Sequence, residues 1–284
     1  MTSVALPVAR AADVAGELRK LPAFLRRDFL VAWSYRFAFV GDFLNLAAQT
    51  VTFYFVGRMV DVSKLPTFGG TRASYMEFVV IGIGVSAFLL FGLGRVANAV
   101  RGEQLMGTLE SILMTPTTNE VLQLGSVVFD LIYIPLRTGL FLVVAGVAFG
   151  LDFELSGIAP AAAILIVFIP FVWGLGVLSA ALTLTFRRGA GAIGLGALGL
   201  GIFSGAYFPV SLLPHWVAAA SEYNPIARAM DGIRSALLGG TGWAGVGTDL
   251  ALLAPLAVIS LALGFLAFEL ALKRERRLGT LGLY

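Results

Sequence analysis

Residues 75–96 read YMEFVVIGIGVSAFLLFGLGRV, and this stretch decides the class of fold. Its charged side chains are Glu77 and Arg95, one near each end. A helix of about 20 apolar residues crosses the hydrocarbon core of a bilayer. The stretch therefore predicts a helix that spans a membrane.

Five further stretches share this length and apolar character. The chain of 284 residues is 58% hydrophobic and 13% charged, and a soluble domain carries about 25% charge. We therefore expect an all-α integral membrane protein without a separate soluble domain. Its six predicted spans are 37–56, 75–96, 121–150, 158–186, 190–208 and 246–272.

The distribution of Lys and Arg predicts the orientation. Fourteen of these residues fall on the side of the N-terminal arm and the C-terminal tail, and five fall on the other side. Cytoplasmic loops carry the excess of positive charge. We expect a cytoplasmic arm at 1–36, a transmembrane domain at 37–272 and a cytoplasmic tail at 273–284, in a bacterial inner membrane.

The arm contains a predicted amphipathic helix at 22–36. Leu25, Phe29, Ala32 and Trp33 fall on one helical face, and Pro22 suits a first helical turn. Such a helix lies at a membrane surface. The alternative is that its positive charge only sets the topology.

The connection after the second span, residues 101–116, reads RGEQLMGTLESILMTP. Leu105, Leu109, Ile112 and Leu113 form one apolar helical face, which a soluble partner can hold in a groove. The alternative is a helix resting on the membrane surface. That alternative is disfavoured, because the stretch carries two acids and one base, and anionic lipid attracts the reverse.

The outer connection, residues 209–240, predicts a re-entrant hairpin of two short helices. The first covers about 214–220, and Asn224 with Pro225 opens the second, which runs to about 238 before Gly239 and Gly240. Non-helical backbone at membrane depth must be buried in protein or line a cavity. We expect Ser221, in this connection, to be reachable from outside the cell.

Several polar or small residues lie within the predicted spans. For Asp42, Asp130, Arg137 and Glu269 we favour ion pairs over a substrate or proton role, and we expect no direct pair between Asp130 and Arg137. Asn45, Gln49 and Thr52 form a polar stripe that lines a path or hydrogen-bonds across helices. Gly201 and Gly205 form a GxxxG pair, which predicts close helix packing within the bundle or between subunits.

The sequence also excludes several classes of site. It has no Cys and one His, His215, so disulfides, thiolate sites and multi-histidine metal sites are absent. Its three lysines are followed by Leu21, Leu65 and Arg274, and none fits the P-loop pattern GxxxxGK[ST]. ATP hydrolysis must therefore come from another chain. The rhomboid GxSG pattern and the DxxD pattern of prenyl-transfer enzymes are also missing.

Two motifs carry a resemblance to a known family. The pattern ExxxGTLExxLxTP over 103–116 resembles the coupling-helix signature of ABC-2 type exporter permeases. The sequence Ser204-Gly205-x-x-Phe208-Pro209, followed by Leu213-Pro214, Asn224-Pro225 and Arg234, is similar to the segment before that family's last span. The two motifs occur in the family's order and on the matching sides of the membrane.

The resemblance implies a permease subunit that is not itself an enzyme. It would pair with a second permease subunit, as homodimer or heterodimer, and bind an ABC ATPase subunit that holds ATP and Mg; it implies no cofactor in this chain and no nucleic-acid partner. The coupling helix would bind the ATPase through Glu103, Gly107, Thr108, Leu109, Glu110, Leu113 and Pro116. The outer gate would comprise Phe208, Pro209, Pro214, Asn224, Pro225 and Arg234.

The cargo expected from the spans is a hydrophobic or amphiphilic compound, such as a drug-like molecule or a lipid, because they carry little charge and many aromatic residues. A permease for polysaccharides or lipid-linked glycans is an alternative. A secondary transporter that works without ATP is a further alternative, but the two halves of the chain show no internal repeat.

Overall fold

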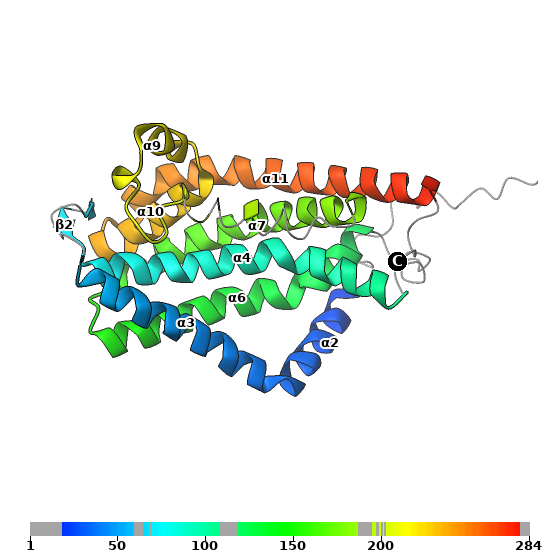
Figure 1. Cartoon of the computed structure of the whole chain (residues 1–284), viewed down its shortest axis with the longest axis horizontal. Coiled ribbons are helices and arrows are strands. Elements are labelled where there is room, and N and C mark those ends of the chain that lie inside the picture. The colour runs from blue at the N-terminus through cyan, green and yellow to red at the C-terminus, as the bar shows by residue number, and fades with distance from the viewer. Residues whose placement is uncertain are drawn as a thin grey trace, which may run out of the picture.

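Four long helices form the body of the protein (Figure 1). The computed structural model describes residues 19–59, 65–68, 70–107, 119–186, 195–196, 199, 201 and 203–278. The four helices are α4 (Tyr75–Leu105), α6 (Asn119–Phe149), α7 (Ile158–Thr185) and α11 (Gly242–Leu278). Each is long and apolar enough to cross a membrane. The expected class, a helical integral membrane protein, is confirmed.

Helix α7 is the centre of this bundle. It packs between α4 and α11, and α6 lies on the other side of α4. At the α7–α11 crossing, a side chain on Gly174 would overlap the backbone of Ser260, and one on Gly264 would overlap the backbone of Gly174. Lipid supplies no hydrophobic drive between helices, so such close backbone contact stabilises the pair through van der Waals packing.

Two further helices, α2 (Leu21–Ser34) and α3 (Arg36–Gly57), meet at Tyr35 and form a V beside the bundle (Figure 1). Helix α2 contacts α6, and α3 contacts α4. Helix α2 confirms the predicted N-terminal helix, and α3 coincides with the first predicted span. The first and fifth predicted spans are not among the four that meet the length and apolarity criterion, so the total of six spans stays a prediction.

Two helices extend beyond the spans predicted for them. Helix α4 continues past residue 96 to Leu105, and α11 continues into the predicted tail as far as Leu278. No new helix begins at Arg101, where the coupling helix was predicted to start. Instead α4 ends in a turn at Met106 and Gly107, and Gly107 has φ +69°. Residues 108–116 of that prediction lie outside the described part of the chain.

The predicted GxxxG pair of the fifth span is also corrected. Gly201 is helical, but the chain turns at Ser204 and Gly205, and Gly205 has φ +70°. Gly205 therefore does not share a helix face with Gly201. Most of residues 190–202 lie outside the described residues.

Short elements cover one end of the bundle: the antiparallel pair β1 (Thr67–Phe68) and β2 (Thr71–Arg72), the 3-10 turns η2 (Leu155–Gly157) and η3 (Val210–Leu212), and helices α9 (His215–Glu222) and α10 (Pro225–Gly239). The predicted start of α10 is confirmed, because the Asn224 side chain accepts a hydrogen bond from the Ile226 amide at 3.0 Å. The C-terminal ends of α4 and α11 lie at the opposite end (Figure 1).

Candidate functional site

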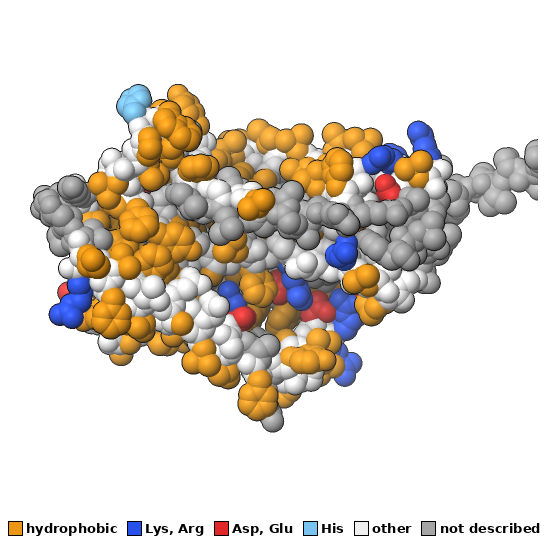
Figure 2. Space-filling view, viewed as in Figure 1, with side chains coloured by type: hydrophobic (Ala, Val, Ile, Leu, Met, Phe, Trp, Pro, Cys, Tyr) orange, Lys and Arg blue, Asp and Glu red, His pale blue; other side chains and the backbone are white. Residues whose placement is uncertain are grey.

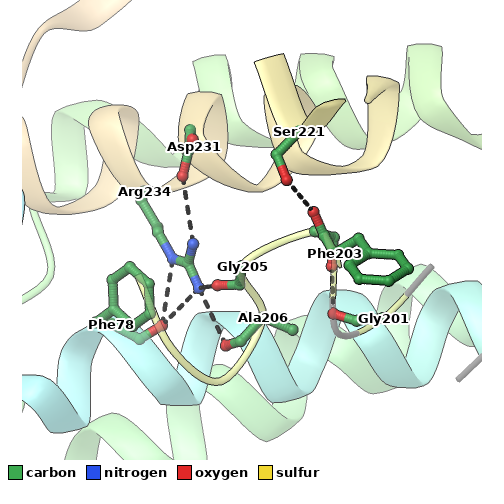
Figure 3. Close-up of polar contacts among 9 residues, drawn as sticks. Phe78, Gly201, Phe203, Gly205, Ala206, Ser221, Asp231 and Arg234 are labelled. Carbon is green, nitrogen blue, oxygen red and sulfur yellow. Dashed lines mark hydrogen bonds and ion pairs between the residues drawn. The ribbon is translucent and has the colours of Figure 1, made fainter. Parts of the chain in front are cut away.

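The predicted gate residues lie within residues 203–240, which we call the outer cap after the side of the membrane that the sequence predicts for it. Arg234 of α10 is at its centre and is 1% exposed. Its guanidinium donates hydrogen bonds to the carbonyl oxygens of Phe78 on α4, Gly205 and Ala206, at 3.0–3.3 Å (Figure 3). Its carbon Cζ lies 3.5 Å from the centre of the Phe78 ring. The Arg234 side chain therefore holds together α10, α4 and the turn at Gly205 and Ala206.

Arg234 also pairs with Asp231, one helical turn earlier, at 3.3 Å. Burial lowers the pKa of Arg234 to about 10, and the Asp231 carboxylate opposes this shift. Because this pKa remains well above 7, the guanidinium is protonated at neutral pH. The charge-assisted bonds to the three carbonyls are thus present under physiological conditions.

A second set of bonds fixes α9 to the start of the cap. The Ser221 hydroxyl donates to the Phe203 carbonyl at 2.7 Å (Figure 3). The Asn224 amide donates to the same carbonyl at 3.4 Å. Ser221 is 5% exposed. The expectation that Ser221 is reachable from outside is therefore wrong, because its side chain faces the cap interior.

Helix α3 joins the cap through aromatic side chains. Phe53 stacks on Tyr207 with ring centres 4.9 Å apart, and its edge meets Phe208 at 6.5 Å. The Tyr75 hydroxyl, at the start of α4, donates to the Tyr207 carbonyl at 3.1 Å. The cap is thus tied both to the first predicted span and to the second. Pro209 and Pro214 flank η3 between these contacts and α9.

The predicted coupling residues are described only in part. Glu103 lies in the last turn of α4, and Gly107 lies in the turn that follows. Thr108, Leu109, Glu110, Leu113 and Pro116 lie outside the described residues. Their binding role stays a prediction.

The charges within the predicted spans form ion pairs, two of them between helices. Arg137 of α6 donates to Asp42 of α3 at 2.8 Å, and Arg95 of α4 donates to Asp130 of α6. Glu269 pairs with Lys273 on the same helix, α11, at 3.3 Å. The expected ion pairs are present, and Asp130 and Arg137 do not pair directly. Sequence alone did not give the partners of Asp42 and Asp130, since these partners lie on other helices.

The polar stripe of α3 faces away from the bundle. Asn45 and Thr52 are exposed and Gln49 is half-buried. The Gln49 amide donates to Asn45 Oδ1 at 2.7 Å, and the Thr52 hydroxyl donates to the Ala48 carbonyl. These two bonds therefore lie within α3 rather than across helices. A role in lining a path stays a prediction.

Large hydrophobic side chains cover much of the outer surface (Figure 2). Leu136 and Val147 of α6, Ile166 of α7 and Val258 of α11 are each more than 60% exposed. Water-soluble proteins rarely expose apolar patches of this extent, whereas lipid accepts them. Among the described residues, no group of three His, Asp or Glu side chains is placed to hold a metal ion.

Comparison with known proteins places the chain in a family. Among the curated proteins compared, none matches the sequence. The sequence model described as ABC-2 type transporter matches residues 19–238. This range includes α2, the charged pairs of α3, α4 and α6, and nearly all of the outer cap. The chain therefore belongs to the ABC-2 type transporter family.

Proposed function

We propose that this chain is the transmembrane permease subunit of an ABC exporter. It moves a hydrophobic or amphiphilic compound out of the cytoplasm or the inner leaflet, and a separate nucleotide-binding subunit supplies the energy. One observation carries the proposal: a chain of the ABC-2 transporter family has no P-loop lysine of its own. A P-loop lysine reaches the β- and γ-phosphates of bound nucleotide, so its absence here supports an ATPase on a partner subunit.

The proposed subunit has six spans and works as a dimer, with both termini in the cytoplasm of a bacterial cell. The exposed apolar surfaces of α6, α7 and α11 support a position within lipid. The asymmetry of Lys and Arg supports the orientation. In this arrangement the outer cap faces the exterior, and the turn at Gly107 faces the cytoplasm.

Helix α4 links the two proposed working ends of the molecule. It has 31 residues and is therefore about 46 Å long. The Phe78 carbonyl, near its first turn, accepts from Arg234 of the cap, and its last turn leads into the proposed coupling segment. A force applied by the ATPase at that segment would move α4 as a unit. The cap would then follow, since Arg234 of α10 binds the Phe78 carbonyl of α4. The same guanidinium binds the carbonyls of Gly205 and Ala206 and so holds α10 to the start of the cap. Rigid-body shifts of packed helices of this kind underlie many switching transitions.

The proposal is tested by charging the apolar face of the coupling segment. The double variant Leu109→Asp, Leu113→Asp places two carboxylates where the ATPase groove would hold leucine side chains. We expect this variant to reach the membrane in normal amounts but to retain no ATPase subunit on purification. Cargo-stimulated ATP hydrolysis of the assembled complex should be lost as well.

The matched control is Ser111→Asp, which adds a carboxylate to the same segment away from its apolar face. We expect it to bind and stimulate the ATPase as the unaltered chain does. Normal binding and stimulation by the double variant would refute the assignment of the coupling segment.

A further inference from the structure

An apolar recess lies between α2 and α6. Its cavity of about 760 Å³ is within the range of sites for drug-sized ligands, about 300–1,000 Å³. The apolar face predicted for α2 lines one side of this cavity, and α6 lines the other. The main apolar side chains are Leu25, Phe29, Trp33, Phe129, Ile132 and Leu136.

A smaller polar cavity of about 210 Å³ adjoins the apolar one. Both cavities are lined by Ala32, Phe129 and Tyr133, so they form one recess with an apolar part and a polar part. Charged side chains gather in the angle between α2, α3 and α6 (Figure 2). The charged residues that line the polar part are Asp28, Asp42, Asp130 and Arg95.

Two of these carboxylates already have close partners across helices, Asp42 with Arg137 and Asp130 with Arg95. Asp28 differs. Its Oδ1 accepts from the neighbouring Arg27 at 2.8 Å, but its Oδ2 is buried and receives no hydrogen bond from any residue that the structure describes.

The Asp28 side chain is only 9% exposed, and a buried acceptor without a donor costs about 1–3 kcal/mol. The polar part of the recess is therefore lined by a carboxylate with one unsatisfied acceptor, and a hydrogen-bond donor would stabilise it.

The walls of the polar part favour a cationic donor. Each of its three aspartates has an arginine partner, so the charges of its wall are balanced. Its one lining arginine, Arg95, is held by Asp130, whereas Asp28 keeps an acceptor without a donor. The aromatic side chains of Tyr35 and Phe129 also line this part, and the ring of Phe91 is already covered by Arg137 at 4.8 Å. Aromatic faces attract ammonium ions.

We propose that this recess binds a lipophilic amine. Its protonated amine pairs with the Asp28 carboxylate, and its hydrophobic body lies in the apolar part between α2 and α6. The size of the apolar part favours a compact or single-tailed molecule over a two-chain phospholipid, whose phosphate would also lie beside the aspartates. As a statement about cargo, the inference rests on the proposed export function and specifies its substrate class.

The test measures binding to the full chain in phosphatidylcholine nanodiscs, with empty discs as the reference for partition into lipid. The probes are a naphthyl-tailed alkylammonium and the alcohol with the same tail, each followed by fluorescence anisotropy. We expect the chain to bind the ammonium probe at least about tenfold more tightly than the alcohol, as a charge-assisted hydrogen bond implies.

Two variants and one control separate the parts of the recess. Asp28→Asn should weaken binding of the ammonium at least about tenfold and leave the alcohol unchanged. Phe29→Ala, in the apolar part, should weaken both probes by the same factor. Glu269→Gln removes a carboxylate on α11, away from the recess, and should bind both probes as the unaltered chain does. Monodisperse elution of each variant in nanodiscs verifies its fold.

Three results would each overturn the inference: equal affinity of the unaltered chain for the two probes, unchanged ammonium binding by Asp28→Asn, or an equal loss in Glu269→Gln. Displacement of the probe by phosphatidylethanolamine in the discs would overturn the assignment to a compact amine. The measurement contains no ATPase and no transport step. It can therefore fail while the proposed permease function stands, and it can succeed if that function is wrong.

Discussion

Replacing Arg234 by Ala should release the outer cap from α4. The substitution removes the donor for three backbone carbonyls, those of Phe78, Gly205 and Ala206. It also removes a guanidinium that stacks on the Phe78 ring. Asp231 is 57% exposed, so its carboxylate stays hydrated after the change. The loss therefore arises mainly from the three carbonyls.

Each buried acceptor left without a donor costs about 1–3 kcal/mol. The carbonyls of Gly205 and Ala206 lose this donor, whereas that of Phe78 keeps its donor within α4 and loses one charge-assisted bond. At about 1 kcal/mol for each of the three, the loss is about 3 kcal/mol. Removing the cation also removes the cost of burying it, and for this reason we take the lower end. A change of 1.4 kcal/mol is tenfold in an equilibrium constant, so local opening of the cap should become about a hundredfold more frequent.

Hydrogen exchange measured by mass spectrometry in nanodiscs is the suitable assay, because it reports local opening segment by segment. Peptides covering α10 and residues 203–214 should exchange about a hundredfold faster in Arg234→Ala. Peptides from the α7–α11 contact should exchange at the rate of the unaltered chain, since Arg234 does not touch that contact.

Arg228→Ala is the matched control, because Arg228 lies on the same helix. Its side chain is 39% exposed and lies 3.6 Å from Asp249. An exposed pair of this kind contributes up to about 1 kcal/mol, so the control should speed exchange by at most about fivefold. Equal exchange rates in Arg234→Ala and Arg228→Ala would refute the role given to Arg234.

Two further predictions concern topology and packing. In a chain carrying Tyr223→Cys, an impermeant thiol reagent should label intact cells, because Tyr223 is exposed in the cap; Ser221→Cys should stay unlabelled, because Ser221 is buried. Labelling of Tyr223→Cys only after the cells are opened would contradict the proposed orientation. Gly174→Ala should lower the thermal unfolding midpoint, because the added methyl forces α7 and α11 apart at a cost of about 1–3 kcal/mol. Gly102→Ala, which meets no atom within 4 Å, should leave the midpoint unchanged or raise it; equal midpoints for both variants would contradict the packing argument.

Local chemistry made parts of the fold predictable. The start of α10 follows from Asn224 and Pro225 alone, because both effects act within the first turn of the helix. The Asn224 side chain accepts a hydrogen bond from a first-turn amide, and Pro225 has no backbone N–H that would need a partner there. The apolar stretches of α4, α6, α7 and α11 were found by length and hydropathy. Two of these helices run beyond the apolar stretches, to Leu105 and Leu278, because a helix continues into water when its polar residues are good helix formers.

Contacts between distant segments were not predictable from one sequence. Arg234 was singled out through the family resemblance, but its main acceptor, Phe78, lies 156 residues away. The partners of Asp42 and Asp130 likewise depend on how α3, α4 and α6 cross. The open oxygen of Asp28 is visible only when α2 is placed against α6. Periodicity gives the face of a helix and does not identify its partner.

The central claim is that this permease draws its energy from a separate ATPase, and purification of the tagged chain from its own cell membranes in mild detergent tests that claim most directly. We predict that a P-loop subunit accompanies the chain in equal amount and that the purified complex hydrolyses ATP. The Leu109→Asp, Leu113→Asp variant, purified in parallel, should lose both the subunit and the hydrolysis. A well-folded chain that purifies without any P-loop subunit, and that transports cargo into proteoliposomes on an ion gradient without ATP, would contradict the claim.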